Sequence, residues 1–102
     1  MNEELRRILL EALRDVEYRT VILFGSRARG DFTLDSDYDI LLVTRGQLTI
    51  REKMDLSASF RRRLARGGVD ADVIVKSDAE VNYYRDKVGS LVKSAVEEGV
   101  AL

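Results

Sequence analysis

Two short apolar runs with only a loop between them constrain the fold of this chain more than any other feature. The run Thr20–Phe24 stops at Gly25, and the run Asp39–Val43 follows a polar stretch punctuated by glycine. Both have the length and the β-branched composition of buried strands. Parallel neighbours need a crossover of about a dozen residues or more, usually a helix. The stretch Gly25–Ser36 has room for one helical turn, so we expect a mixed rather than a purely parallel sheet.

Four longer helices are expected beside the strands. Residues 3–15 place apolar side chains three and four positions apart, as an amphipathic helix does. Thr49–Glu52 and Ser77–Glu80 are capping boxes, each of which begins a helix. The second of these helices should run to about Tyr84, and a last one covers residues 88–98. The helix after Thr49 should end at the glycine pair Gly67-Gly68 and pack through one face, formed by Ile50, Met54, Ser57, Phe60 and Leu64.

The whole pattern predicts an α/β (α+β) fold with one small mixed sheet packed against helices. Val69–Val75 is the third expected strand, and Val100–Leu102 could add a short edge strand. A chain of 102 residues fits one hydrophobic core. We therefore expect a single domain over residues 1–102.

Composition excludes several kinds of chemistry. The chain has neither cysteine nor histidine, which removes thiolate catalysis, histidine general bases and the usual zinc sites. Reactive groups must be carboxylates, hydroxyls, lysine or arginine. A formal net charge of −1 argues against a dedicated nucleic-acid binder. The first residues are charged and amphipathic, and no apolar run approaches a membrane span, so we expect a cytoplasmic protein without a membrane partner.

The end of the first strand is the first candidate site. Gly25 lets a ligand approach the backbone closely, and Ser26 would offer its hydroxyl together with the free amides of a helical turn to an anion. A plain strand-to-loop glycine is the alternative. Gly25 and Gly30 have the outer spacing of a P-loop, but Asp31 and Phe32 stand where lysine and serine or threonine are required.

Carboxylates at the start of the second strand form the next candidate. Asp37 and Asp39 are two residues apart, so a strand would place them on one face. Two adjacent anions repel unless a cation lies between them, and Mg²⁺ prefers oxygen ligands of this kind. The alternative is that these residues, with Asp35, are solvated charges at the mouth of the strand.

A third carboxylate is expected from the next strand, where Asp70 and Asp72 interrupt an apolar run. An aspartate inside a buried strand requires a partner. Either a metal shared with the first pair supplies it, or a salt bridge to Arg61 or Arg29 does. Carboxylates on neighbouring strands could hold two metal ions for an in-line displacement at phosphorus. Asp72 would then accept the proton of the attacking hydroxyl.

Three sets of side chains have two interpretations each. Arg29 and, less readily, Arg27 could contact phosphates, or either could pair with Asp31 or Asp35. The basic helix end formed by Arg61, Arg62, Arg63 and Arg66 is expected to be solvated and to complement the helix dipole; docking of an acidic partner is the alternative. We expect packing roles, rather than nucleobase stacking, for Tyr83 and Tyr84.

The string Gly25-Ser26, ten residues, then Asp37-x-Asp39 resembles the signature of the DNA polymerase beta nucleotidyltransferase superfamily. The fuller pattern, from Gly25 to Asp39 with Asp72-Val73-Ile74-Val75 and Glu97-Glu98-Gly99, is similar to the minimal nucleotidyltransferases of prokaryotes. The resemblance implies a mixed-sheet core, Mg²⁺ (two ions) and a nucleoside triphosphate, usually ATP. Gly25 and Ser26 would bind phosphates, and Asp37 and Asp39 the metals. Asp72 fits the third acidic position better than Asp70.

The same resemblance implies a partner. Such enzymes are commonly paired with helical HEPN-domain toxins and act as antitoxins by adenylylating a toxin tyrosine. Because the sequence shows no separate acceptor-recognition domain, another molecule is expected to complete the acceptor site in a homo- or hetero-oligomer. Two alternatives stay open: transfer to a small-molecule hydroxyl, and an inactive antitoxin that neutralises its partner by contact alone.

Overall fold

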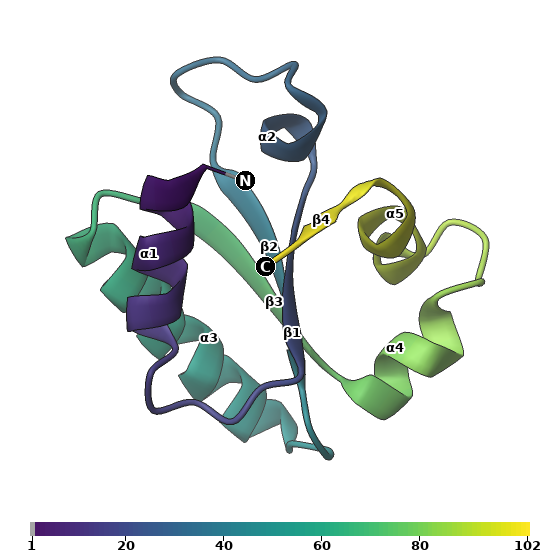
Figure 1. Ribbon diagram of the computed structural model, residues 1–102. Helices are drawn as coiled ribbons and strands as arrows, with labels where there is room; N and C mark the ends of the chain where they lie inside the picture. Colours follow the sequence, from purple (N-terminus) through teal and green to yellow (C-terminus); the bar gives the residue numbers. More distant parts are fainter. Residues whose placement is uncertain (1) are drawn as a thin grey trace.

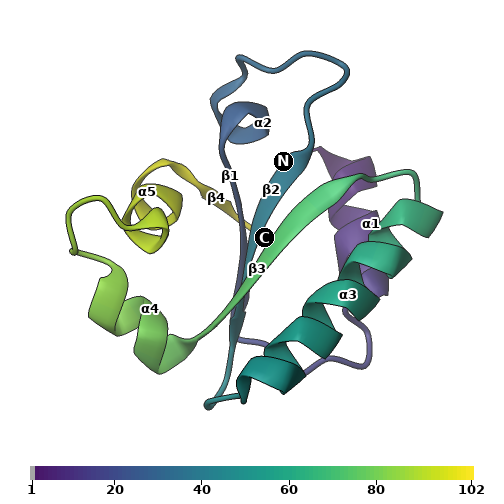
Figure 2. The ribbon, with the colours of Figure 1, turned by 180° about the vertical axis from the view of Figure 1, so that it is seen from behind.

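A four-stranded mixed sheet with helices on both faces forms the protein (Figures 1 and 2). The computed structural model describes residues 2–102. The strand order is β3-β2-β1-β4. β1 runs antiparallel to both β2 and β4, whereas β2 and β3 are parallel. The predicted mixed sheet is therefore confirmed. In chain order the elements are α1 (Glu3–Ala12), β1 (Thr20–Phe24), α2 (Ser26–Arg29), β2 (Tyr38–Thr44), α3 (Ile50–Arg66), β3 (Ala71–Ser77), α4 (Asp78–Tyr84), α5 (Leu91–Glu98) and β4 (Val100–Ala101).

Strand register brings the predicted motifs to one end of the sheet. The antiparallel pairing of β1 with β2 sets Phe24 opposite Asp39, so the turn that leaves β1 begins beside the first acidic residue of β2. The α3 crossover then returns the chain to start β3 alongside the start of β2, with Asp39 opposite Asp72. At this end of the sheet, the loop after β1 thus meets the Asp37-x-Asp39 segment and Asp72.

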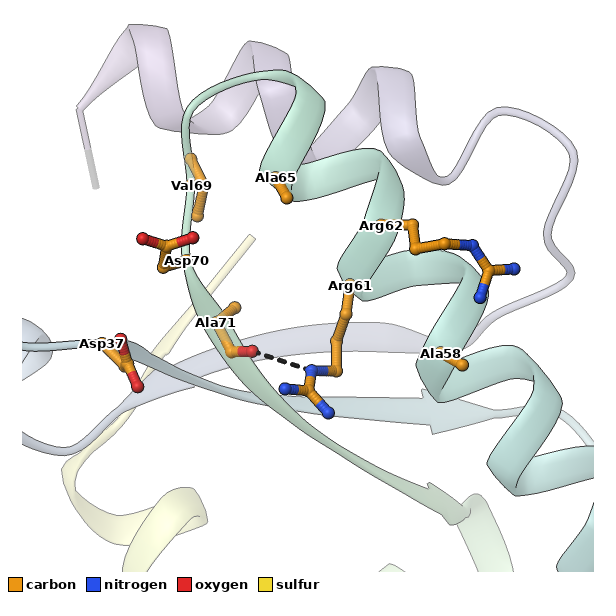
Figure 3. A pocket seen from close by; sticks show the side chains of 8 residues that line it. All are labelled: Asp37, Ala58, Arg61, Arg62, Ala65, Val69, Asp70 and Ala71. Carbon is orange, nitrogen blue, oxygen red and sulfur yellow. Dashed lines mark hydrogen bonds between the residues drawn. The ribbon is translucent and has the colours of Figure 1, made fainter.

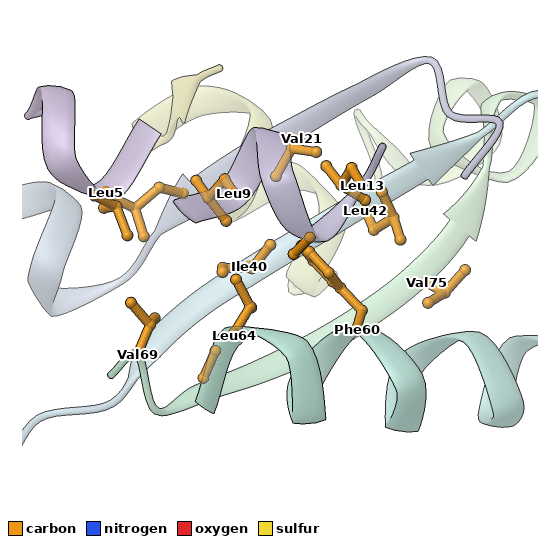
Figure 4. Close-up of a cluster of buried hydrophobic side chains, with 13 residues drawn as sticks. Leu5, Leu9, Leu13, Val21, Ile40, Leu42, Phe60, Leu64, Val69 and Val75 are labelled. Carbon is orange, nitrogen blue, oxygen red and sulfur yellow. The ribbon is translucent and has the colours of Figure 1, made fainter. Parts of the chain in front are cut away.

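The central strand β2 is covered on both faces. Ile40 and Leu42 belong to the larger core, between the sheet and the helices α1 and α3 (Figure 4). Leu41 and Val43 belong to a smaller cluster on the other face, with Ala95 of α5. A strand buried on both faces needs an unbroken apolar sequence, as Ile40–Val43 provides. The largest side chains of the main core that are fully buried are Phe60, Leu9, Leu13, Ile40, Leu42, Leu64 and Val21.

Both predicted capping boxes are present. Thr49 and Ser77 each accept from the amide three residues on, and Glu52 and Glu80 reciprocate. The predicted face of α3 is wrong in its first turns, since Ile50 and Met54 are 78% and 66% exposed. Met54 lies beside β3 at the open edge of the sheet, where it lines a shallow hollow with Val73 and Val75. Of the predicted face, Phe60 and Leu64 are buried in the core.

Element ends differ from the expected ones by a few residues. α1 ends at Ala12 rather than near residue 15, and α5 starts at Leu91, because Ser90 caps it. β3 starts at Ala71 rather than Val69. At the end of α3, Gly68 adopts the left-handed conformation, with φ +86°, and Gly67 does not. Within residues 2–102, every helix is too short or too polar to span a bilayer.

Candidate active site

Gly25 forms the turn from β1 into the short helix α2. Its φ of +74° lies in the left-handed region, which favours glycine. Its carbonyl accepts from the amides of Ala28 and Arg29, so the amides of Ser26 and Arg27 precede the first intrahelical bond. A Cβ built on Gly25 would lie 2.2 Å from Oδ2 of Asp39. The expected close approach to the glycine backbone is therefore made by a carboxylate of the chain itself.

Asp39 is the centre of a small acidic group. It is half-buried on β2, directly opposite Asp72 of β3. Burial raises the pKa of Asp39 above its usual value, and the negative charges of Asp72 and Asp37 raise it further, while Arg29 acts in the opposite direction. The structure thus brings together the three carboxylates that the sequence singled out.

Asp37 contributes differently from the prediction. It lies in the loop just before β2 and is exposed. The two-residue strand period therefore does not by itself place Asp37 beside Asp39, although the charge of Asp37 still acts on Asp39. The backbone next to Asp37 is held by the amide of Tyr38, which donates to the carbonyl of Asp70 at 2.9 Å.

The premise about Asp70 and Asp72 is wrong, because neither carboxylate is buried. Both residues are exposed, and Asp70 precedes β3. Neither forms an ion pair with Arg61 or Arg29 among the described residues. Asp72 faces Asp39 through the strand register, whereas Asp70 lies with Asp37 along the rim of a neighbouring hollow (Figure 3). Register therefore favours Asp72 as the third member of the group.

The donor set at this edge fits a divalent cation. It consists of carboxylate oxygens, the ligands that Mg²⁺ prefers. The pKa of Asp39 is raised first by burial and then by the negative charges of Asp72 and Asp37, and a cation would counteract both effects. Within residues 2–102, no three or more acidic side chains are arranged so that they could hold a metal ion by themselves. Magnesium typically completes its coordination with water and substrate phosphates.

Arg29 is engaged in two ion pairs. Its guanidinium lies 3.4 Å from Asp31 and 3.4 Å from Glu98 of α5. The first is one of the pairings considered from the sequence, and the second joins segments that are distant in the chain. The side chain is about half exposed, and its positive charge offsets part of the increase in the pKa of Asp39. Contact with phosphate therefore stays a prediction for Arg29.

Arg27 has a role that the sequence interpretation missed. Its guanidinium carbon lies 4.3 Å from the ring centre of Phe32 and 4.5 Å from that of Tyr38. Nε and Nη2 donate to the carbonyl of Ser36 at 3.1 and 2.9 Å. A more distant bond reaches the carbonyl of Leu34. The arginine thus fastens the loop that carries Asp37, and two aromatic residues at the ends of that loop are the sequence signal that could have indicated it.

Comparison with known proteins decides the family. The family described as "Polymerase beta, Nucleotidyltransferase" matches residues 7–100, nearly the whole chain. The chain belongs to this nucleotidyltransferase family. The resemblance inferred from Gly25-Ser26 and Asp37-x-Asp39 is confirmed, as is the predicted fold class.

Relatives of this nucleotidyltransferase are found by sequence and by structure. It is 36% identical over 85 residues to "Putative protein adenylyltransferase MJ0604" of Methanocaldococcus jannaschii, over 82% of this chain and 77% of that protein. A crystal structure of "a putative nucleotidyltransferase from Sulfolobus solfataricus" has a TM-score of 0.60 at 28% identity, covering 97% of this chain and 82% of that one. A chain in the structure of a tri-AMPylated Shewanella oneidensis HEPN toxin with its MNT antitoxin has a TM-score of 0.54 at 19% identity, covering 96% and 67%. At 19% identity, this last similarity shows only a shared fold.

Proposed function

We propose that this nucleotidyltransferase transfers AMP from ATP, with Mg²⁺, to a tyrosine hydroxyl of a helical HEPN-type toxin and thereby acts as its antitoxin. The observation that carries the proposal is the position of Asp39 between Gly25 and Asp72. This places an acidic group directly beside a glycine turn with free amides. The names of the relatives, which refer to protein adenylylation and to a HEPN partner, support the choice of nucleotide and acceptor.

The triphosphate is assigned to the turn after β1. The amides of Ser26 and Arg27 and the hydroxyl of Ser26 would donate to phosphate oxygens. Gly25 leaves room for the Asp39 carboxylate beside this turn, since a Cβ there would displace it. Arg29 would add positive charge if phosphate replaced one of its two carboxylate partners.

The acidic group is assigned to the metals. Asp37, Asp39 and Asp72 would hold Mg²⁺, which supplies charge neutralisation at the α-phosphate and at the leaving group. Binding would compensate the buried charge of Asp39 and its repulsion by Asp72 and Asp37, the two causes that raise the pKa of Asp39.

The transfer step is an in-line displacement at the α-phosphorus. Asp72 would accept the proton of the tyrosine hydroxyl as the oxygen–phosphorus bond forms. The bond between the α- and β-phosphates breaks, and pyrophosphate leaves with its electron pair. The modified tyrosine then carries AMP as a phosphodiester.

Mass spectrometry of the partner tests this proposal. The protein would be incubated with ATP, Mg²⁺ and the product of its neighbouring open reading frame, for which we expect a helix-rich protein with an Arg-x-x-x-x-His motif. We expect a tyrosine of the partner to gain the mass of AMP, and the reaction to require Mg²⁺. Unmodified partner tyrosines would overturn the protein acceptor, and pyrophosphate release with a small-molecule hydroxyl would assign the reaction to that acceptor instead.

A further inference from the structure

Another hollow, of about 440 Å³, opens on the face of the sheet that carries Asp39 and Asp72. Residues two apart on a strand share a face, so Asp72, Ile74 and Lys76 form one row along β3. Ile74 packs against the smaller core cluster, which contains Leu41, two residues after Asp39. This row therefore lies on the side of the sheet that α4 and α5 cover (Figures 1 and 2). The hollow is bounded by the row and by these two helices, and its walls are formed by Ile74, Lys76, Tyr84, Ser90, Leu91 and Val92.

The walls of this hollow are mainly apolar and partly open to solvent. Tyr84 and Leu91 are 39% and 45% exposed, and covering such apolar surface favours association. Lys76 is the one charged wall residue in the described chain, and its ammonium group lies 5.8 Å from the ring centre of Tyr84. The hollow therefore offers an apolar surface with a single positive charge.

The charge of Lys76 is available to an anion. Lys76 lies four residues from Asp72, about 13 Å along the strand, which exceeds the screening length of about 8 Å at physiological ionic strength. A carboxylate bound at Lys76 is thus screened from the acidic group. Within residues 2–102 Lys76 has no ion-pair partner, and the acidic residues of α4 and α5 pair with other cations, namely Asp78 with Arg19, Glu80 with Lys53, Glu97 with Lys93 and Glu98 with Arg29.

The hollow lies on the acceptor side of the proposed reaction. In the strand order β3-β2-β1, Ser26 follows β1 and the hollow borders β3, so the two lie on opposite sides of Asp39. An in-line displacement requires the attacking and leaving oxygens on opposite sides of phosphorus. With the triphosphate at Ser26, the attacking hydroxyl comes from the side of Asp72, in the same row as the hollow.

We propose that this hollow binds the polypeptide segment that carries the acceptor tyrosine, through an apolar side chain two positions from the tyrosine and a carboxylate four positions from it. The inference rests on the proposed function and deepens it by naming the surroundings of the acceptor hydroxyl. An extended segment has the rise per residue of β3. With its tyrosine at Asp72, the segment places the apolar side chain over Ile74 and the carboxylate at Lys76. The adenine of ATP fits less well, because it is uncharged and leaves Lys76 without a partner.

Synthetic peptides provide the test. The first has a central tyrosine, leucine two positions and glutamate four positions away on both sides, and glycine in between, so that it fits in either chain direction. The second has lysine in place of glutamate, and the third has serine in place of leucine. The variants are K76E and L91S, and the matched controls are R51E and V88S, because Arg51 and Val88 are exposed outside the hollow. Peptide binding, AMP transfer and ATP binding are measured for each protein, with thermal melts to confirm folding.

We expect the unmodified protein to bind the leucine–glutamate peptide about threefold to tenfold more tightly than either of the other two. K76E should reverse the preference between glutamate and lysine, a rescue that a loss of structure would not produce. L91S should weaken binding of the leucine–glutamate peptide by about threefold to tenfold and have little effect on the serine peptide. ATP binding should be unchanged, and R51E and V88S should behave like the unmodified protein.

Three results would overturn the docking site. The first is absent or equal binding of the three peptides by the unmodified protein, and the second is a K76E protein that still prefers glutamate. The third is weaker ATP binding in folded K76E or L91S, which would assign the hollow to adenine. Failure of the proposed function gives a different result, in which the peptides bind with the expected preferences but receive no AMP from ATP and Mg²⁺.

Discussion

Oδ2 of Asp39 occupies the space that a side chain at Gly25 would require, since a Cβ there would lie 2.2 Å away. The antiparallel pairing of β1 with β2 creates this relationship by bringing the end of one strand beside the start of the other. The phosphate-binding turn and the metal-binding carboxylate of the proposed site are thus mutually dependent. A change at the glycine should act on the reaction through the carboxylate.

Gly25→Ala is therefore expected to lower AMP transfer by about 100-fold, the usual effect of misplacing a catalytic group by about 1 Å. Steady-state labelling with α-labelled ATP measures the loss. The control is Gly30→Ala. Gly30 also has a positive φ, +88°, but nothing lies within 4 Å of its added Cβ. It is in the αL conformation, at a strain of about 1–2 kcal/mol for alanine, whereas Gly25 combines its positive φ with a ψ of −157°, a region that is essentially restricted to glycine. The control therefore tests a positive-φ substitution without the clash. Equal loss of transfer in both variants would contradict the account.

Two substitutions distinguish the catalytic roles of Asp72 and Asp70. Asp72→Asn should reduce transfer by about 10²–10⁴-fold, as loss of a general base does, because Asp72 faces Asp39 across the strand pair. Asp70→Asn should have a much smaller effect, because Asp70 precedes β3 and does not face Asp39 in the strand register. Single-turnover labelling compares the two. A larger loss with Asp70→Asn would assign the third carboxylate to the other residue.

The raised pKa of Asp39 predicts how stability depends on pH. A carboxyl that binds its proton more tightly in the folded state loses stability as pH rises from its ordinary pKa of 3.8 through its raised folded value. Below 3.8 both states are protonated and the penalty disappears. Without metal, Asp39→Asn should therefore melt at a higher temperature than the unmodified protein at neutral pH, with the difference vanishing at low pH.

Magnesium should reverse that difference. Added Mg²⁺ with a non-hydrolysable ATP analogue is expected to stabilise the unmodified protein and to have little effect on Asp39→Asn. Thermal melts at fixed pH measure both effects. Equal stabilisation of the two proteins would argue against a metal at Asp39.

Arg27→Ala tests whether this arginine positions the loop or binds phosphate. The substitution removes the donors to the carbonyl of Ser36 and the contact with Phe32 and Tyr38. We expect a loss of transfer of about tenfold to 100-fold, a higher Mg²⁺ requirement, and metal-free ATP binding that is unchanged. Arg27→Lys should restore little, because an ammonium group lacks the planar fork. A large loss of metal-free ATP binding would indicate a phosphate contact instead.

Local patterns in the sequence were sufficient for most of the fold. The apolar run Ile40–Val43 and the two capping boxes depend on neighbouring residues, and each formed the predicted element. The direct link across Gly25–Ser36 correctly excluded a purely parallel sheet.

Features that depend on distant contacts could not be predicted in the same way. The exposure of Asp70 and Asp72 follows from their place at the start of an edge strand, which the apolar run after them conceals. Ile50 and Met54 follow the helical period but stay exposed, because no element of the described chain covers that part of α3. The ion pair between Arg29 and Glu98 joins residues that only the folded chain brings together.

The central claim is that carboxylates beside Gly25 carry nucleotidyl transfer to a protein tyrosine. The most direct test compares the unmodified protein with Asp37→Asn/Asp39→Asn, both folded, in the presence of the helical partner, labelled ATP and Mg²⁺. We predict AMP on a partner tyrosine and neutralisation of the partner with the unmodified protein, and loss of both with the variant. Neutralisation by the variant without any AMP transfer would contradict the claim and identify an antitoxin that acts by binding alone.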